Sequence, residues 1–447
     1  MATVKMTEGS PFRLQLAYSF SLVLGNLFQL AYNAVDSIIV GRFIGKEALA
    51  AVGTASPVMN IVILSISGIT IGAGVLMSNY YGAGKDELLK KEVATLSVFG
   101  LFFSLAVAII GVLICKPLVS LIQVPVEIQP ITIRYLSIIF LGTPFTYFYN
   151  SLSAALKSVG DSKTPLKFLV ISSLFNMGAD IILIGFLGFG ITCAALTTVV
   201  AQALSAILCV GYIYRKVTIL SLPLRDFKID RILLKRTLNY GSITALQQSV
   251  QPICKLLIQG AVNTLGVDMI AVYNAVTRVD DFAFTPEQSI ASGITTYVAQ
   301  NEGAGKRERI VKGFRSGLLI EVLYWVFIFI VSFSLRFRIM ELFVSKDSVS
   351  MIEIGAKYIA LMSLLYILPA LTNGIQGFMR GIRKMKITLL CTAIQASMRV
   401  VFVYLLISHL GIISVAVASS LGWILMLMVE VPIYFFYKKK EFSQIDT

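Results

Sequence analysis

The chain has 447 residues, of which 57% are hydrophobic and only 14% charged, and its mean hydropathy is +0.82. Soluble globular chains average about 45–50% apolar and about 25% charged residues, so this composition excludes an ordinary soluble domain and indicates an integral membrane protein. The formal net charge of +14 would suit a nucleic-acid partner, but the placement of the basic residues points to another origin.

Twelve apolar stretches follow one another, each long enough for a helix to cross a hydrocarbon core of about 30 Å. In chain order they are expected at 14–40, 48–80, 93–115, 131–157, 166–186, 190–214, 238–262, 268–299, 313–335, 353–378, 387–409 and 411–437. The polar start, Met1 to Ser10, lacks the features of a cleaved signal peptide, so the first stretch is expected to be the first membrane helix. The sequence therefore predicts an all-α integral membrane fold of twelve transmembrane helices.

The basic residues predict the orientation of these helices. If both termini and the even-numbered loops face the cytoplasm, that side holds 27 lysines and arginines, and the opposite side holds six. The six are Arg42, Lys46, Lys116, Arg336, Arg338 and Lys346. Because cytoplasmic loops carry an excess of Lys and Arg, we expect both termini in the cytoplasm. The same bias accounts for the net charge, so no nucleic-acid partner is expected.

The second half of the chain repeats the first at an offset of about 221 residues. Tyr81 to Lys85 reappears as Glu302 to Lys306, and Gly190-Ile191 reappears as Gly411-Ile412. Each repeat holds an even number of helices, so both should enter the membrane from the same side, as in transporters built from parallel repeats related by a pseudo-two-fold axis. The expected parts are an N-terminal six-helix lobe (1–214), a cytoplasmic linker (215–236) and a C-terminal six-helix lobe (237–447).

Short motifs occur in a fixed order along these repeats. They are Asp36 to Gly45, Ala48 to Gly53, Gly72 to Gly74, Tyr80 to Gly84, Gly160 to Pro165, Ala299 to Asn301 and Gly303 to Lys306. Together they resemble the multidrug and toxic compound extrusion (MATE) family of the multidrug/oligosaccharidyl-lipid/polysaccharide flippase superfamily, over roughly residues 15–435. The resemblance implies two six-helix bundles in a V around a central cavity. It also implies export of organic compounds, driven by inward flow of protons or sodium ions.

Polar residues inside predicted membrane helices are the candidates for ion coupling. A charged side chain at a helix centre costs about 2.5–3.5 kcal/mol, so each carboxylate there needs a reason. Asp36 lies in the first stretch, Asn176 and Asp180 lie one turn apart in the fifth, and Thr198 lies in the sixth. Their oxygens suit Na⁺, the two carboxylates can equally hold a proton, and two such groups close together should titrate as a coupled pair.

Family members with a coupling site in the N-terminal half carry acidic and amide residues at these helix positions. The resemblance therefore implies that Asp36, Asn176, Asp180 and Thr198 bind the coupling ion, H⁺ or Na⁺, and ligate the metal if the ion is Na⁺; no other cofactor is expected. The structural alternative is that Asp36 caps its helix near the outer surface and that the other residues only join helices. The repeat argues for coupling, since Asp36 aligns with Leu257 and the acidic cluster is absent from the second half.

A further polar set is expected to line the substrate cavity. Its members are Gln29, Asn33, Gln248, Lys255, Arg278, Asp280, Asp281, Glu287 and Arg399. The alternative is mutual neutralisation, for example of Arg278 by Asp281 three residues later. Lys255 and Arg399 leave the charge of the substrate open, because an exporter of organic cations has no obvious need for them.

The expected function is secondary active efflux of amphipathic organic compounds, foremost cationic ones, in exchange for H⁺ or Na⁺, by a monomer in the bacterial cytoplasmic membrane. The alternative is a lipid-linked oligosaccharide flippase of the same superfamily. Such flippases often have more than twelve spans, so the twelve predicted spans argue against this alternative. They also often have a strongly cationic cavity, so Lys255, Arg278 and Arg399 argue for it. Neither a nucleophile–base pair nor an ATP-binding domain is visible in the sequence, so an enzyme is not expected.

Overall fold

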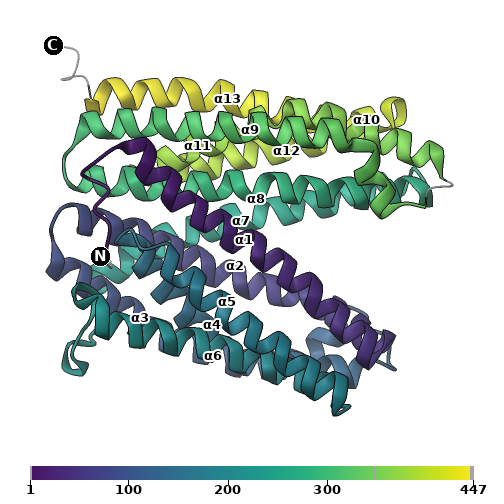
Figure 1. Ribbon diagram of the computed structural model, residues 1–447, viewed down its shortest axis with the longest axis horizontal. Helices are drawn as coiled ribbons and strands as arrows, with labels where there is room; N and C mark the ends of the chain where they lie inside the picture. Colours follow the sequence, from purple (N-terminus) through teal and green to yellow (C-terminus); the bar gives the residue numbers. More distant parts are fainter. Residues whose placement is uncertain (1–2, 346–347, 443–447) are drawn as a thin grey trace. The chain divides into compact units, whose positions relative to one another are not determined.

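The computed structural model describes residues 3–345 and 348–442; Lys346, one of the six basic residues expected on the outer side, and the extreme ends of the chain lie outside the described residues. The described chain is helical and contains no strand. Its α-helices are α1 (Pro11–Ile39), α2 (Lys46–Gly82), α3 (Asp86–Leu121), α4 (Gln129–Ser158), α5 (Lys163–Asp180), α6 (Ile191–Lys216), α7 (Arg231–Asn263), α8 (Val267–Gly303), α9 (Arg307–Phe343), α10 (Val349–Leu365), α11 (Ile367–Gly381), α12 (Met385–Leu410) and α13 (Ile413–Phe442) (Figure 1).

These thirteen helices correspond to the twelve predicted stretches, because α10 and α11 together occupy the stretch expected at 353–378. Within the described part of the chain, nine helices are long and apolar enough to cross a membrane, and the bent α10–α11 pair makes ten. The remaining two, α7 and α8, are 33 and 37 residues long but more polar. The predicted all-helical membrane fold is confirmed, and its two most polar helices are α7 and α8.

The bend between α10 and α11 has a local cause that the hydropathy pattern does not show. The two helices meet at Tyr366 with an angle of 41°. Pro369 lacks the N–H that would donate to the carbonyl of Leu365, so the helical ladder is interrupted there. The indole N–H of Trp325 in α9 donates to the carbonyls of Ser363 and Leu364 at 3.2 Å, which satisfies backbone acceptors beside the break.

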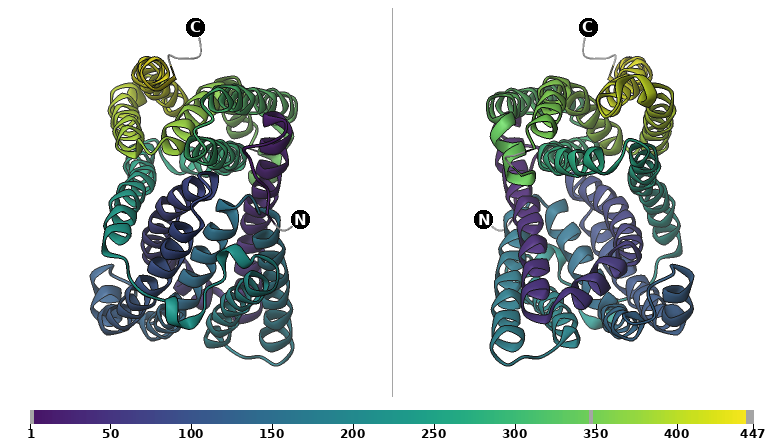
Figure 2. Two further views of the ribbon diagram at one scale, coloured as in Figure 1. Left: turned by 90° about the vertical axis from the view of Figure 1, so that its left-hand side faces the viewer. Right: turned by 90° about the vertical axis from the view of Figure 1, so that its right-hand side faces the viewer.

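By their contacts the residues form two compact units. The N-terminal unit comprises Met1–Lys5 and Leu24–Ala245, and the C-terminal unit comprises Met6–Val23 and Leu246–Thr447. Each unit is a bundle of long helices that run roughly along one another (Figures 1 and 2). In the N-terminal unit α4 packs on α2, α3 and α6, and in the C-terminal unit α8 packs on α9, α10 and α11. The lobe and linker boundaries expected from the sequence stay a prediction.

Each unit also contains the first half of the helix that begins the other repeat. In the N-terminal unit, a Cβ on Gly72 of α2 would lie 2.7 Å from the backbone nitrogen of Gly241 of α7 and 3.0 Å from the carbonyl carbon of Tyr240. In the C-terminal unit, a Cβ on Gly293 of α8 would lie 2.1 Å from Oγ of Ser19 of α1. Gly72 and Gly293 are 221 residues apart in the sequence, which is the repeat offset, and so are their partners Ser19 and Tyr240. The duplication therefore extends to this packing, which only glycine permits.

Cysteine labelling tests the predicted orientation. Glu127, between α3 and α4, and Lys228, between α6 and α7, are exposed and are expected on opposite sides of the membrane. In a variant with its five native cysteines replaced by alanine, Glu127→Cys should react with an impermeant maleimide in intact cells. Lys228→Cys should react only after permeabilisation, because the positive-inside bias places it in the cytoplasm. Labelling of both positions from outside would contradict the orientation.

Candidate functional site

The two aspartates predicted to bind the coupling ion lie where an α-helix changes into a π-helix. Asp36 lies in the last turn of α1, which continues directly into a π-helical turn at Val40–Ile44. Asp180 is the last residue of α5 and is followed directly by a π-helical turn at Ile181–Phe186. The two turns contact each other within the N-terminal unit. Such turns are rare and occur frequently at functional sites.

The carboxyl groups of Asp36 and Asp180 lie within reach of a side-chain hydrogen bond to each other. Asp180 is 1% exposed, and its Oδ1 accepts a hydrogen bond from Oγ1 of Thr197 at 2.5 Å. The second oxygen of Asp180, Oδ2, and Oδ1 of Asp36 are buried and have no donor in the described part of the chain. Two ionised carboxylates in this arrangement repel, and a proton or a cation between them removes the repulsion.

Asn176 and Thr198, the other two predicted ligands, also lie beside this pair. The Asn176 side chain is fully buried, interacts with Asp180, and accepts a hydrogen bond from Oη of Tyr32 at 2.5 Å. The hydroxyl of Thr198 donates to the carbonyl of Ala194 in its own helix at 2.9 Å and interacts with Tyr32. All four predicted ion-coupling residues are thus gathered in the N-terminal unit, with Thr198 at the edge of the group.

Three residues of the site were not predicted from the sequence. Thr197, not its neighbour Thr198, donates to Asp180. Tyr32 lies one turn before Asp36 and bonds to Asn176, and Tyr135 of α4 interacts with both aspartates. Tyr32 could have been found from its four-residue spacing to Asp36, which places both on one helix face. Adjacent positions such as 197 and 198 point about 100° apart, and the sequence does not fix that rotation.

A small pocket in the N-terminal unit adjoins the site. Its volume is about 100 Å³. Helices α2, α4 and α6 line it mainly with apolar side chains, among them Met59 and Val199. Thr198 contributes to the lining, as does Gln202, whose Oε1 is buried without a donor among the described residues. An apolar wall with a few unpaired polar atoms is typical of a site for small organic groups.

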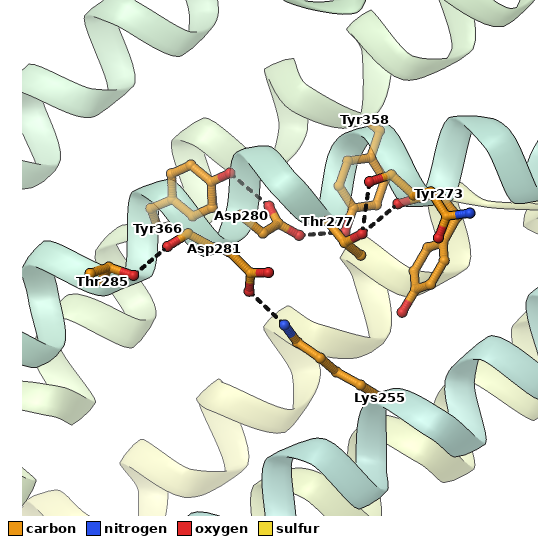
Figure 3. Close-up of polar contacts among 9 residues, drawn as sticks. Lys255, Tyr273, Thr277, Asp280, Asp281, Thr285, Tyr358 and Tyr366 are labelled. Carbon is orange, nitrogen blue, oxygen red and sulfur yellow. Dashed lines mark hydrogen bonds and ion pairs between the residues drawn. The ribbon is translucent and has the colours of Figure 1, made fainter. Parts of the chain in front are cut away.

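The C-terminal unit holds a separate polar cluster around Asp280 of α8. Asp280 is buried and accepts hydrogen bonds from Oη of Tyr366 at 2.7 Å and Oη of Tyr358 at 3.1 Å (Figure 3). The buried Arg399 of α12 interacts electrostatically with Asp280, and its Nε has no acceptor among the described residues. The guanidinium charge and the carboxylate charge offset each other here.

Asp281, the next residue, points to a different partner. Its Oδ1 lies 2.5 Å from Nζ of Lys255 of α7, and these side chains are 40% and 46% exposed (Figure 3). Asp281 therefore pairs with Lys255 and not with Arg278, which is exposed and forms no ion pair within the described residues. Half-exposed ion pairs contribute only about 0–1 kcal/mol, so this pair can open at little cost.

The remaining residues expected to line a substrate cavity have unlike surroundings. Gln29 and Asn33 are exposed, Gln248 is half-buried, and Glu287 is fully buried. Glu287 accepts a long hydrogen bond of 3.5 Å from Nδ2 of Asn373. The role of all nine residues in binding substrate stays a prediction.

Known proteins resemble the chain over most of its length. A family profile described as MatE matches residues 22–182 and 244–405, and the two segments begin 222 residues apart. "Probable multidrug resistance protein YoeA" of Bacillus subtilis (strain 168) is 25% identical over 354 residues, 78% of this chain and 76% of the relative. The "FAD transporter" of Shewanella oneidensis is 25% identical over 307 residues, 66% of each chain. The "Crystal structure of MATE in the bent conformation" superposes with a TM-score of 0.92 at 21% identity and covers 100% of both chains, which shows the fold.

Removing the Tyr32 hydroxyl tests the proposed ion-binding site. Tyr32→Phe deletes the donor to Asn176 and leaves a buried amide oxygen unpaired, which costs about 1–3 kcal/mol. H⁺ or Na⁺ should raise the midpoint temperature of thermal unfolding. The ion concentration that gives half of this rise should be roughly tenfold higher in Tyr32→Phe than in the wild type. Tyr404→Phe, whose exposed hydroxyl bonds to the carbonyl of Leu257, is the matched control. An unchanged ion dependence in Tyr32→Phe would exclude Tyr32 from the site.

Proposed function

The chain belongs to the MatE family, and from this membership and the geometry of its carboxyl pair we propose that it is a secondary antiporter exporting amphipathic organic compounds in exchange for H⁺ or Na⁺. The observation that carries the proposal is the contact between Asp36 and Asp180, each of which has one buried oxygen without a donor among the described residues. A charged pair in an apolar bundle is costly unless it binds and releases a cation. Thr197, Asn176 and Tyr32 hold the pair in place and supply further oxygens.

Binding of the ion would act on α1 and α5 together. With a cation between the carboxyls the two helix ends are held close, and without it their charges separate them. Residues of α1 up to Val23 belong to the C-terminal unit, and those from Leu24 onward belong to the N-terminal unit. A shift at Asp36 would therefore be transmitted along one continuous helix. Gly25, beside this boundary, is the position where α1 bends most readily. Transport requires that the two conformations bind the ion with different affinity.

The site favours a cationic over an anionic substrate. Thr198 belongs both to the pocket and to the group around the aspartates, so departure of the ion leaves negative charge beside the apolar pocket. The cationic residues that would favour a flippase are largely offset: Lys255 pairs with Asp281, and Arg399 lies by Asp280. We propose that the protein acts as a monomer in the bacterial cytoplasmic membrane, with both termini in the cytoplasm.

Efflux under separately imposed gradients tests the function and identifies the ion. Liposomes that contain the purified protein are loaded with a fluorescent organic cation. Either a pH gradient or a sodium gradient is then imposed across their membrane at zero membrane potential. We expect efflux above leakage with the gradient of the ion that binds at the Asp36–Asp180 pair. Leakage alone under both gradients would contradict antiport, and transport of a lipid-linked pyrophosphate would support the flippase.

Neutralising either aspartate should uncouple transport. Asp36→Asn fills the same space, so expression and folding should persist, but the amide neither titrates nor attracts Na⁺. Gradient-driven efflux should fall at least a hundredfold, while equilibrium binding of the drug is retained. Asp180→Asn should behave alike, and the double variant should be little worse than either single variant, since the two residues act as one unit.

Asp86→Asn is the matched control, because Asp86 is exposed in the first turn of α3 in the same unit. It should transport normally, as should Glu353→Gln at the exposed start of α10. Normal gradient-driven efflux by Asp36→Asn would refute the assignment.

A further inference from the structure

Helices α8 and α9 of the C-terminal unit each bury a glutamate near the middle of their length. Glu287 and Glu321 are both 0% exposed. Glu287 lies sixteen residues before the end of α8, and Glu321 lies fourteen residues after the start of α9. At about 1.5 Å per residue both carboxyls are roughly 20 Å or more from the helix ends, in the interior of the bundle. Neither belongs to the site around Asp36.

The two glutamates lie on facing sides of α8 and α9. Oη of Tyr324 in α9 donates a hydrogen bond of 3.0 Å to the carbonyl of Ala283 in α8. Ala283 is four residues before Glu287, and Tyr324 is three residues after Glu321, so each carboxyl shares a helix face with one end of this bond. The two carboxyls interact electrostatically with each other and with Tyr324.

The pair has almost no hydrogen-bond donors. The bond of 3.5 Å from Asn373 reaches Oε2 of Glu287. Oε1 of Glu287 and both carboxyl oxygens of Glu321 are buried and have no donor within the described residues. An unpaired buried acceptor costs about 1–3 kcal/mol, and an ionised one costs more.

Neither glutamate forms an ion pair with a positive charge among the described residues. Tyr366, at the bend between α10 and α11, interacts electrostatically with Glu287. Of the charged residues on α10, Glu353 and Lys357 are exposed, and Arg380 of α11 interacts with Glu430 of α13. The first half of α1 presents uncharged groups to α8 and α9, chiefly Gln15, which donates to the carbonyl of Gly313, and Ser19.

We propose that Glu287 and Glu321 form a second proton-binding site, which exchanges its proton during transport. One proton removes a charge and supplies a donor that the pair lacks, since a protonated carboxyl carries an O–H. Hard cations such as Ca²⁺ and Mg²⁺ collect about six oxygens, and the pair offers only three that are free of donors. At the repeat offset Glu287 aligns with Ile66 and Glu321 with Gly100, so the first repeat has no counterpart.

A polar connection joins this pair to the Asp280 cluster. Tyr366 donates to Asp280 at 2.7 Å (Figure 3). It also interacts with Glu287, which lies two turns further along α8. Tyr366 thus connects the Asp280 cluster to Glu287. Because Tyr366 stands at the bend between α10 and α11, a change in that bend would alter this connection.

Infrared spectroscopy of the purified full-length protein tests the proton without requiring transport. At neutral pH the wild type should show a carboxylic C=O band that shifts in D₂O, and the double variant Glu287→Gln, Glu321→Gln should lose part of it. Asp36→Asn should retain that part. The control is the double variant Glu341→Gln, Glu353→Gln, which replaces two exposed glutamates on α9 and α10. An unchanged band in the Glu287/Glu321 variant would overturn the proposal, as would loss of the remaining band from Asp36→Asn protein on adding Na⁺.

If the double variant does not fold, the single variants Glu287→Gln and Glu321→Gln provide the same comparison. Proton exchange during transport rests on the proposed antiport and is measured separately. The quantity measured is the steady-state ratio of drug concentrations across the membrane, at a pH difference of one unit and zero membrane potential. Loss of one coupled proton should reduce that ratio by about tenfold, since one pH unit is worth a factor of ten per proton. An unchanged ratio in a variant that has lost the band would overturn the exchange during transport.

Discussion

Two carboxyl groups buried together in an apolar helix bundle repel each other unless a proton or a cation lies between them. The ends of α1 and α5 meet under this constraint at Asp36 and Asp180. Thr197 bonds to one oxygen of Asp180, and the other oxygen has no donor in the described part of the chain, so the surrounding donors satisfy the pair only in part. A fully satisfied pair would be a rigid structural contact. An incompletely satisfied pair can gain and lose an ion, which is the property that the proposed antiport needs.

Sequence reasoning succeeded where one helix is sufficient for the argument. Apolar length predicted the helices, and the cost of charge in a span singled out Asp36 and Asp180, which the structure brings together. It failed where the answer depends on the rotation of a helix or on a distant partner. Thr197 and Thr198 differ only in which side of α6 they occupy, and Glu321 interacts with a residue 34 positions earlier on another helix. The bend at Tyr366 was missed because the prediction rested on the apolar length of residues 353–378 and not on Pro369 within them.

The two repeats have kept their packing but not their charges. A glycine is required wherever two helices touch at backbone distance, and this demand is the same in both copies, so Gly72 and Gly293 occupy equivalent places. A buried carboxyl pair is different, because burying two like charges costs stability wherever it occurs. One pair joins α1 with α5 and the other joins α8 with α9, helices that are not equivalent under the repeat. Asymmetric chemistry on a symmetric scaffold fits a protein whose units perform different steps.

Helix α1 is the element through which the two carboxyl pairs can influence each other. Its first half packs in the C-terminal unit, where Oε1 of Gln15 would lie 2.8 Å from a Cβ on Gly317, one turn before Glu321. Its second half carries Asp36 in the N-terminal unit, 21 residues or about 31 Å further along the axis. In the proposed mechanism, a change in the spacing of α8 and α9 on gain or loss of a proton would act on Gln15 and Ser19. Within this proposal a straight α1 would pass that displacement toward Asp36, whereas a bend at Gly25, the one glycine of α1, would absorb it.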